Sequence, residues 1–221
     1  IANNKQTIAK LEEAAQALYR KMFVDDVDVE NLPEGWRMGT IGDYSKVKSG
    51  FAFKSDWWQK VGVPVIKIGS ISDNAIKRDN CDFVDESKIG YARDSRAKYG
   101  DIVIAMTGAT IGKIAINYNK ELYLVNQRVG LFNLGNEPMN KAPFLYITLL
   151  TDFVQNEIKS VGGDSAQANI SGSDIEKIEF ILPNEDATNE FNKKTKCILE
   201  MISNIWNENE KLTEMLSVVM A

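Results

Sequence analysis

The stretch from Tyr99 to Leu134 constrains the fold most, because four short apolar runs follow one another there with turn residues between them. The runs are Ile102–Met106, Lys113–Asn117, Leu122–Val125 and Val129–Leu134. Short runs rich in β-branched residues and punctuated by Gly and Asn are typical of strands joined by tight turns. We therefore expect a twisted, mainly antiparallel sheet, built as a meander, at the centre of an α+β protein.

Long amphipathic helices are predicted at both ends of the chain. Apolar residues recur there every seven positions, with further apolar residues three or four positions behind them, as in the seam of a coiled coil. Asn209 falls in the second seam, where a polar residue sets the register. The predicted helix-pairing residues are Ile8, Leu11, Leu18, Ile198, Ile202, Ile205 and Leu212. This pattern divides the chain into a helix over 1–30, a globular domain over 31–184 and a helix over 185–221.

Shorter elements are predicted on either side of the central runs. Strands are expected at Val63–Ile68 and Lys177–Leu182, and one helix from Pro143 to about Ser160. The segment 79–90 is predicted to be irregular. In residues 92–99, a helical turn would place Arg93 and Arg96 on one face.

The composition excludes several kinds of chemistry. The chain has no histidine, and Cys81 and Cys197 belong to no paired-cysteine motif. We therefore expect no metal or cofactor, free thiols and a reducing, cytoplasmic location. No apolar run is long enough to span a membrane. The segment from Gly108 to Lys113 resembles a phosphate-binding loop, but it is one residue short and continues with Ile114.

Positive charge is concentrated in the middle of the chain. Residues 37–128 hold 15 Lys and Arg against 10 Asp and Glu, whereas the flanks hold 11 against 21. A local basic face matters more for phosphate binding than the net charge of −5. An ordinary solvated surface is the alternative interpretation.

Together the motifs resemble one known family. LPEGW, KSGFAFKS, VPVIKIGSI, YGDIVIAMTGATIGKIAI, LVNQRVGLF and NISGSDIEKIEFILP occur in this order before a long helix. The order resembles the target-recognition repeat of the specificity subunits of type I restriction–modification systems. The leading segment, KQTIAKLEEAAQALYRKMF, resembles the helix that precedes such a repeat.

The resemblance implies a DNA-binding subunit without catalytic activity. A full subunit has two recognition domains, each of which reads one half of a bipartite target in double-stranded DNA. Its two helices pair antiparallel, set the distance between half-sites and dock methyltransferase subunits, which use S-adenosylmethionine to methylate adenine. A separate ATP-dependent motor subunit cleaves and is an indirect partner. This chain would be one repeat, cropped from a longer protein, and would need to dimerise through its helices to bind a whole target.

Candidate DNA contacts follow from this interpretation. Phosphate contacts are expected from Lys48, Lys54, Arg93, Arg96 and Lys113. Base contacts are expected from Thr107, Thr110, Gln127, Arg128, Ser165, Gln167 and Asn169, because amide, hydroxyl and guanidinium groups match base edges. Three alternatives stay open: Arg128 could pair with a carboxylate, the aromatic residues around Lys54 could be core, and the segment 161–170 could be a flexible connector.

Two other functions compete with this one. The chain could be a helix-mediated protein-interaction module with no DNA specificity, which the Trp57–Trp58 pair and acidic flanks would suit. A hydrolase would need carboxylates that converge in a cleft, and the sequence places none together.

Overall fold

The structure is a computed structural model that describes residues 1–163 and 169–219. The chain divides into two compact units: Ile1–Arg37 with Pro183–Ala221, and Met38–Leu182. The two terminal segments therefore belong to one unit. None of the helices in the described part of the chain combines the length and apolarity needed to cross a bilayer.

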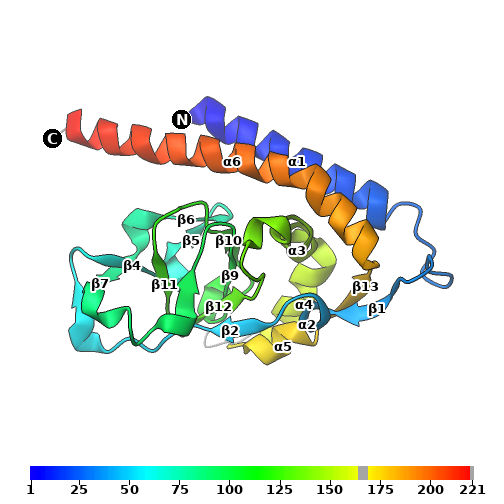
Figure 1. The fold of residues 1–221 in the computed structure, drawn as a ribbon, viewed down its shortest axis with the longest axis horizontal. Helices are drawn as coiled ribbons and strands as arrows, with labels where there is room; N and C mark the ends of the chain where they lie inside the picture. The colour runs from blue at the N-terminus through cyan, green and yellow to red at the C-terminus, as the bar shows by residue number, and fades with distance from the viewer. Residues whose placement is uncertain (164–168, 220–221) are drawn as a thin grey trace. The chain divides into compact units, whose positions relative to one another are not determined.

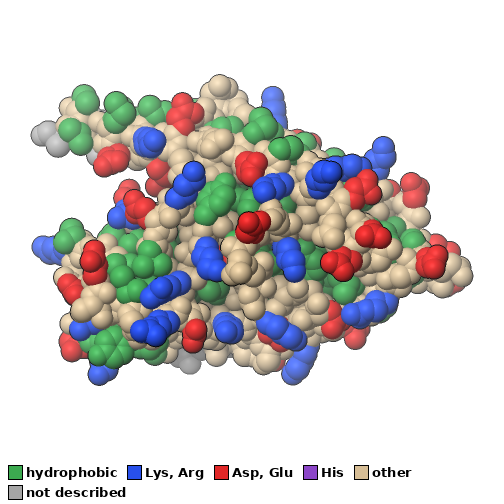
Figure 2. Space-filling model, viewed as in Figure 1, with side chains coloured by type: hydrophobic (Ala, Val, Ile, Leu, Met, Phe, Trp, Pro, Cys, Tyr) green, Lys and Arg blue, Asp and Glu red, His purple; other side chains and the backbone are tan. Residues whose placement is uncertain are grey.

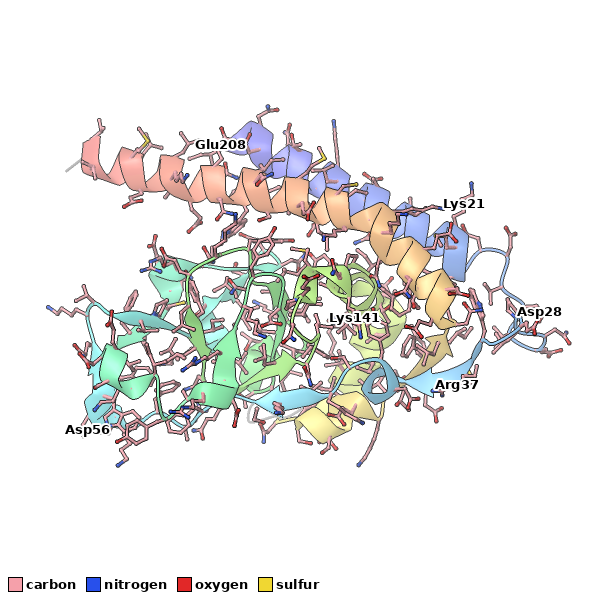
Figure 3. All side chains as sticks on the ribbon, in the orientation of Figure 1. Lys21, Asp28, Arg37, Asp56, Lys141 and Glu208 are labelled. Carbon is pink, nitrogen blue, oxygen red and sulfur yellow. The ribbon has the colours of Figure 1, made fainter. Side chains whose placement is uncertain are left out.

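The first unit is an antiparallel pair of helices, α1 (Ala2–Phe23) and α6 (Glu185–Val219), which lie side by side in Figure 1. At one end of the pair, Phe191 packs edge-on against Tyr19 and Phe23, with ring centroids 5.7 and 5.4 Å apart. At the other end, the Asn4 amide donates to Glu208 Oε2 at 3.1 Å and to Asn209 Oδ1 at 3.0 Å. Figure 3 labels Glu208 at this end. The two predicted end helices are confirmed.

Burial along the helices differs from a simple heptad count. Ile202 is buried, and the other six predicted pairing residues are half-buried. In α1 the most buried side chains are Ala15, Tyr19 and Phe23. Tyr19 and Phe23 lie four residues apart and were not part of the predicted seam. Large aromatic rings thus contribute much of the buried surface of this unit, together with Phe191.

The second unit, which we call the sheet unit, contains a six-stranded and a five-stranded sheet. The six-stranded sheet has the order β2-β12-β9-β10-β6-β5. Its strands are β2 (Val47–Ser49), β5 (Ile71–Ser72), β6 (Ala75–Ile76), β9 (Ile102–Ala105), β10 (Ile114–Ile116) and β12 (Val129–Phe132). The five-stranded sheet has the order β3-β7-β4-β11-β8. Its strands are β3 (Trp58–Gln59), β4 (Val63–Ile66), β7 (Asp82–Val84), β8 (Arg96–Ala97) and β11 (Tyr123–Val125).

A shared apolar core joins the two sheets. It combines Val103, Ala105 and Val129 of the six-stranded sheet with Ile66, Tyr123 and Val125 of the five-stranded sheet. A separate cluster covers the other face of the five-stranded sheet, where Phe51, Phe53, Trp57, Trp58 and Ile89 pack on Val63, Val65, Val84, Ala92 and Leu124. A core role for the aromatic residues around Lys54 is therefore supported.

Helices and a two-stranded ribbon complete this unit. The ribbon pairs β1 (Arg37–Thr40) with β13 (Glu179–Leu182). The helices are α2 (Ile41–Tyr44), α3 (Ala142–Leu150), α4 (Asp152–Gly162) and α5 (Gly172–Glu176). The predicted α+β class is confirmed.

The predicted single meander is wrong. β9, β10 and β12 share one sheet, but β11 lies in the other, parallel to β4 and antiparallel to β8. The turn after β10 therefore carries the chain to the second sheet. Asn117 stabilises this crossing, because its buried side chain donates to the carbonyls of Ala97 and Lys98 at 3.4 and 3.2 Å. Every residue of β9, β10 and β11 is buried, and in β12 only Leu131 is half-buried, so alternation could not show which partners these strands take.

Three shorter predictions also need correction. The helix expected over 143–160 is interrupted at Thr151, whose extended backbone ends α3 and whose hydroxyl caps α4 by accepting from the Val154 N–H. Residues 93–95 form a 3₁₀ turn, η5, and Arg96 already begins β8, so the two arginines share no helical face. The segment 79–90 contains strand β7.

Candidate nucleic-acid interface

The loop between β11 and β12, residues Asn126–Arg128, is held by backbone hydrogen bonds on several sides. The N–H of Asn126 donates to Ile66 O at 3.0 Å, and that of Gln127 donates to Phe51 O at 3.0 Å. Asn126 Oδ1 accepts from the Arg128 N–H at 3.3 Å. The side chains of Gln127 and Arg128 remain exposed. The loop therefore presents two polar side chains from a fixed backbone.

Gly50 makes this arrangement possible. The N–H groups of Gly50 and Phe51 donate to Val129 O and Val125 O at 3.0 and 2.8 Å, so the strand end lies directly against the loop. A Cβ atom at Gly50 would lie 2.2 Å from Val125 O and 2.4 Å from Asn126 O. Only a residue without a side chain fits here. The sequence showed SGF and VNQR as separate motifs, and nothing in their spacing indicated this contact.

A second loop, residues Met106–Lys113, adjoins the first. The Met106 N–H donates to Arg128 O at 3.0 Å, and Met106 O accepts from the Ile170 N–H at 3.0 Å. Thr107 and Asn169 form an antiparallel bridge. Three segments far apart in the sequence, 106–113, 126–128 and 169–170, are thus connected by main-chain hydrogen bonds, and we call them the joined loops.

The hydroxyl groups of the second loop have local roles. Thr110 Oγ1 donates to Thr107 O at 3.1 Å within the 3₁₀ turn η6 (Gly108–Thr110). The Thr107 hydroxyl oxygen is buried and has no hydrogen-bond partner in the described part of the chain. It does not reach the surface, although we expected it at a base edge. Asn169 is exposed, while Ser165 and Gln167 lie outside the described residues.

The six predicted cationic residues are all exposed. They are Lys48, Lys54, Arg93, Arg96, Lys113 and Arg128. None of them forms an ion pair with any carboxylate that the structure describes, whereas Lys46, Lys67, Lys77 and Arg78 each do. The carboxylate partner considered for Arg128 is therefore absent from the described residues. Figure 2 shows many Lys and Arg side chains on the visible face of the sheet unit.

The positions of these cations relative to the loops follow from the strand pairing. Lys48 pairs with Leu131 in β12, just beyond the first loop. Arg96 pairs with Leu124 in β11, and the antiparallel direction of β8 brings η5 (Arg93–Ser95) towards the end of β11 where the first loop begins. Lys113 ends the second loop and accepts the Ala105 N–H at its carbonyl at 2.8 Å. Lys48, Arg93, Arg96 and Lys113 thus lie around the joined loops, whereas Lys54 lies over the Trp57 ring.

Among the residues that the structure describes, the carboxyl and thiol groups with shifted pKa values owe those shifts to burial or to local hydrogen bonds. Burial raises the pKa of the Cys81 thiol to about 11, and both cysteines are free. Hydrogen bonds from Ser171 hold the pKa of Asp174 below its usual value, in the capping box of α5 beside Asn169. The described residues contain no group of three potential metal ligands.

Comparison with known proteins identifies the family. A 25% identical relative, the MjaVIII specificity subunit of Methanocaldococcus jannaschii, aligns over 98% of this chain and 54% of its own length. The EcoAI specificity subunit of Escherichia coli is 28% identical over 90% of this chain and 34% of its own length. The chain thus spans about half or less of these relatives.

Solved structures show the same fold. The S subunit of a type I restriction–modification system from M. genitalium superposes with a TM-score of 0.59 at 18% identity, over 99% of this chain and 55% of that one. The HsdS subunit from Thermoanaerobacter tengcongensis gives a TM-score of 0.53 at 14% identity, over 94% and 48% of the two chains. The sequence model of the type I restriction modification DNA specificity domain matches residues 33–216, and the chain belongs to this family.

Proposed function

We propose that this chain is a non-catalytic DNA-binding module that reads one half of a bipartite target sequence. The observation that best supports this function is the loop Asn126–Arg128, whose exposed amide and guanidinium groups project from a backbone fixed by three neighbouring segments. Base recognition requires donors and acceptors at fixed positions. Membership of the DNA specificity domain family and relatives named specificity subunits support the same role.

The residues divide into two roles. Gln127, Arg128 and Asn169 are the proposed base contacts, since amide groups pair with adenine and guanidinium with guanine. Thr110 can accept a hydrogen bond while its hydroxyl donates to Thr107 O. The proposed phosphate contacts are the five cations Lys48, Lys54, Arg93, Arg96 and Lys113, which keep their charge free for DNA. Ser165 and Gln167 stay predictions from the sequence.

Paired substitutions test this division. Gln127→Ala is expected to weaken binding to the cognate half-site by about 1–3 kcal/mol and to leave non-cognate binding unchanged. Lys48→Gln is expected to weaken binding to every duplex and to reduce the slope of log affinity against log salt by about 0.9. Methylome sequencing of a strain carrying the intact system supplies the half-site, and fluorescence anisotropy over a salt series measures both effects.

Lys120 provides a matched control for the lysine variant. It is exposed and lies before the start of β11, at the opposite end of that strand from Asn126–Arg128. Lys120→Gln is expected to leave the salt slope unchanged. If the wild-type chain binds no duplex at low salt, even with its methyltransferase subunit present, the chain is instead an interaction module without DNA specificity.

We also propose that α1 and α6 are a spacer that docks methyltransferase subunits, through which the restriction subunit joins indirectly. An antiparallel helix pair of fixed register suits this role, because its length fixes a distance along DNA. The amide contact of Asn4 with Asn209 and the packing of Phe191 on Tyr19 fix that register at two points. Co-purification tests the docking. The chain should co-purify with the methyltransferase subunit of the same system, and should no longer do so when α1 and α6 are replaced by an unrelated antiparallel helix pair.

Self-association is a further part of the proposal. Because Asn4 lies opposite Asn209, α6 continues past the start of α1, and Met215, Leu216, Val218 and Val219 are exposed there. Figure 2 shows hydrophobic side chains gathered at this end of the helix, at the upper left. A second copy that covered this stripe would bring two half-site readers together. We expect Leu216→Glu to shift a dimer to monomer in light scattering, because it places a charge in an apolar interface. Asn204→Glu, at an exposed polar position of α6, should not. A wild-type monomer at high concentration contradicts this prediction.

A further inference from the structure

An aromatic and cationic surface lies on the five-stranded sheet, outside the joined loops. Lys54 and Tyr91 are exposed there, and Trp57 and Lys88 are half-buried. Its centre is Trp57 in the 3₁₀ turn η1 (Ser55–Trp57), next to Asp56, which is labelled in Figure 3. The ammonium groups of Lys54 and Lys88 lie 5.6 and 5.1 Å from the centroid of the Trp57 ring. The Tyr91 ring is 5.1 Å from that of Trp57, and Tyr91 is 64% exposed.

The two ammonium groups are available to an anion. Neither Lys54 nor Lys88 forms an ion pair with a carboxylate in the ranges 1–163 and 169–219. Asp85 caps η4 (Glu86–Lys88): its carboxylate accepts from the Ser87 N–H at 2.9 Å and attracts the Lys88 ammonium group without forming an ion pair with it. Contact with an aromatic ring holds each charge near the surface without neutralising it.

The surface is continuous with the proposed base-reading loop. Phe51 stacks on Trp57 with an interplanar angle of 10° and ring centroids 6.0 Å apart. The backbone of Phe51 is bonded to Val125 and Gln127. A row of rings thus leads from the loop Asn126–Arg128 through Phe51 and Trp57 to Tyr91, with lysines beside its outer part.

We infer that Lys54, Lys88, Trp57 and Tyr91 form a flank-binding surface, which holds the sugar–phosphate backbone of duplex DNA beside the half-site. This inference rests on the proposed function and extends it to Lys88, Trp57 and Tyr91. Ammonium groups match phosphates, and an exposed ring packs against deoxyribose whatever the base sequence. The surface therefore adds affinity without specificity.

Duplex length provides the test. Two labelled duplexes carry the same half-site, one ending at its edges and one extended on both sides, and full-length protein binds each over a salt series. Wild-type protein is expected to bind the extended duplex more tightly, with a steeper salt dependence. Lys54→Gln combined with Lys88→Gln should reduce that slope by about 1.8 on the extended duplex only, at about 0.9 for each lost phosphate contact. Lys120→Gln is the control.

The tyrosine ring has its own readout. Tyr91→Ala should weaken binding to the extended duplex about fivefold, the effect of losing one aromatic contact, whereas Tyr91→Phe keeps the ring and the affinity. Equal wild-type binding to both duplexes, or equal effects of the variants on both, overturns the flank-binding surface and leaves the half-site proposal standing. Binding to neither duplex overturns both.

Discussion

Gly50→Ala is expected to destabilise the sheet unit by about 3 kcal/mol and to abolish half-site binding. The added Cβ atom would lie 2.2 Å from Val125 O and 2.4 Å from Asn126 O, and both are backbone atoms that cannot rotate away. The strand end must therefore separate from the loop, which breaks the bonds of Gly50 and Phe51 to β12 and β11. Urea denaturation measures the stability, and anisotropy measures binding under conditions where the variant is folded.

Gly69 offers a matched control for Gly50. A Cβ atom there would meet no atom within 4 Å, and its backbone is not in the left-handed region. Gly69→Ala is expected to leave stability unchanged or to raise it by about 0.4–1 kcal/mol, because alanine has fewer unfolded conformations. If Gly50→Ala behaves like Gly69→Ala, the close approach of the two segments is wrong.

Asp101→Asn is expected to stabilise the sheet unit at neutral pH. Burial raises the pKa of Asp101 to about 6, although its carboxylate accepts from the Lys98 N–H at 2.7 Å. Folding therefore favours the protonated acid, so the contribution of Asp101 is fully present below its ordinary pKa of 3.8 and is lost as the pH rises through 6. Asparagine keeps an acceptor for Lys98 and cannot ionise. The variant should gain up to about 3 kcal/mol over the wild type between pH 4 and 7.

Asp174 gives a control of opposite sign. Hydrogen bonds from Ser171 lower its pKa, so its contribution is present above 3.8 and is lost as the pH falls. Asp174→Asn should therefore destabilise at neutral pH, and the difference from wild type should shrink in acid. Urea denaturation of the three proteins from pH 2 to pH 8 measures both trends, because the Asp174 contribution is lost only below pH 3.8. A stability difference between Asp101→Asn and wild type that does not change with pH contradicts the assignment.

Local patterns predicted the elements of the fold better than their partners. The four apolar runs of 99–134 are strands, and both long helices exist. However, the sequence did not predict that β11 pairs with β4 and β8. A strand that is buried on both faces has no alternation of polar and apolar residues to indicate its neighbour. Thr151 ends a helix that the apolar spacing predicted to continue, because its backbone is extended and its hydroxyl caps the start of α4.

The sequence predicted which loops form the candidate site, but not how these loops contact one another. Amide and guanidinium groups at Gln127 and Arg128 could be found from residue type alone. The contact of Phe51 with this loop could not, because it links two segments through backbone atoms that any sequence possesses. The burial of the Thr107 hydroxyl could not be predicted either, because residue 107 forms a bridge with Asn169, which is distant in the sequence. Lys88 and Tyr91 gave no signal, because the residues beside Trp57 come from a distant turn.

The loop Asn126–Arg128 is secured almost wholly by main-chain groups, and the exposed side chains of residues 127 and 128 take no part in holding it. Substitutions at these two positions therefore carry little folding penalty. Under the proposed function, a new target preference would then need only one or two codon changes, without compensating mutations elsewhere in the protein.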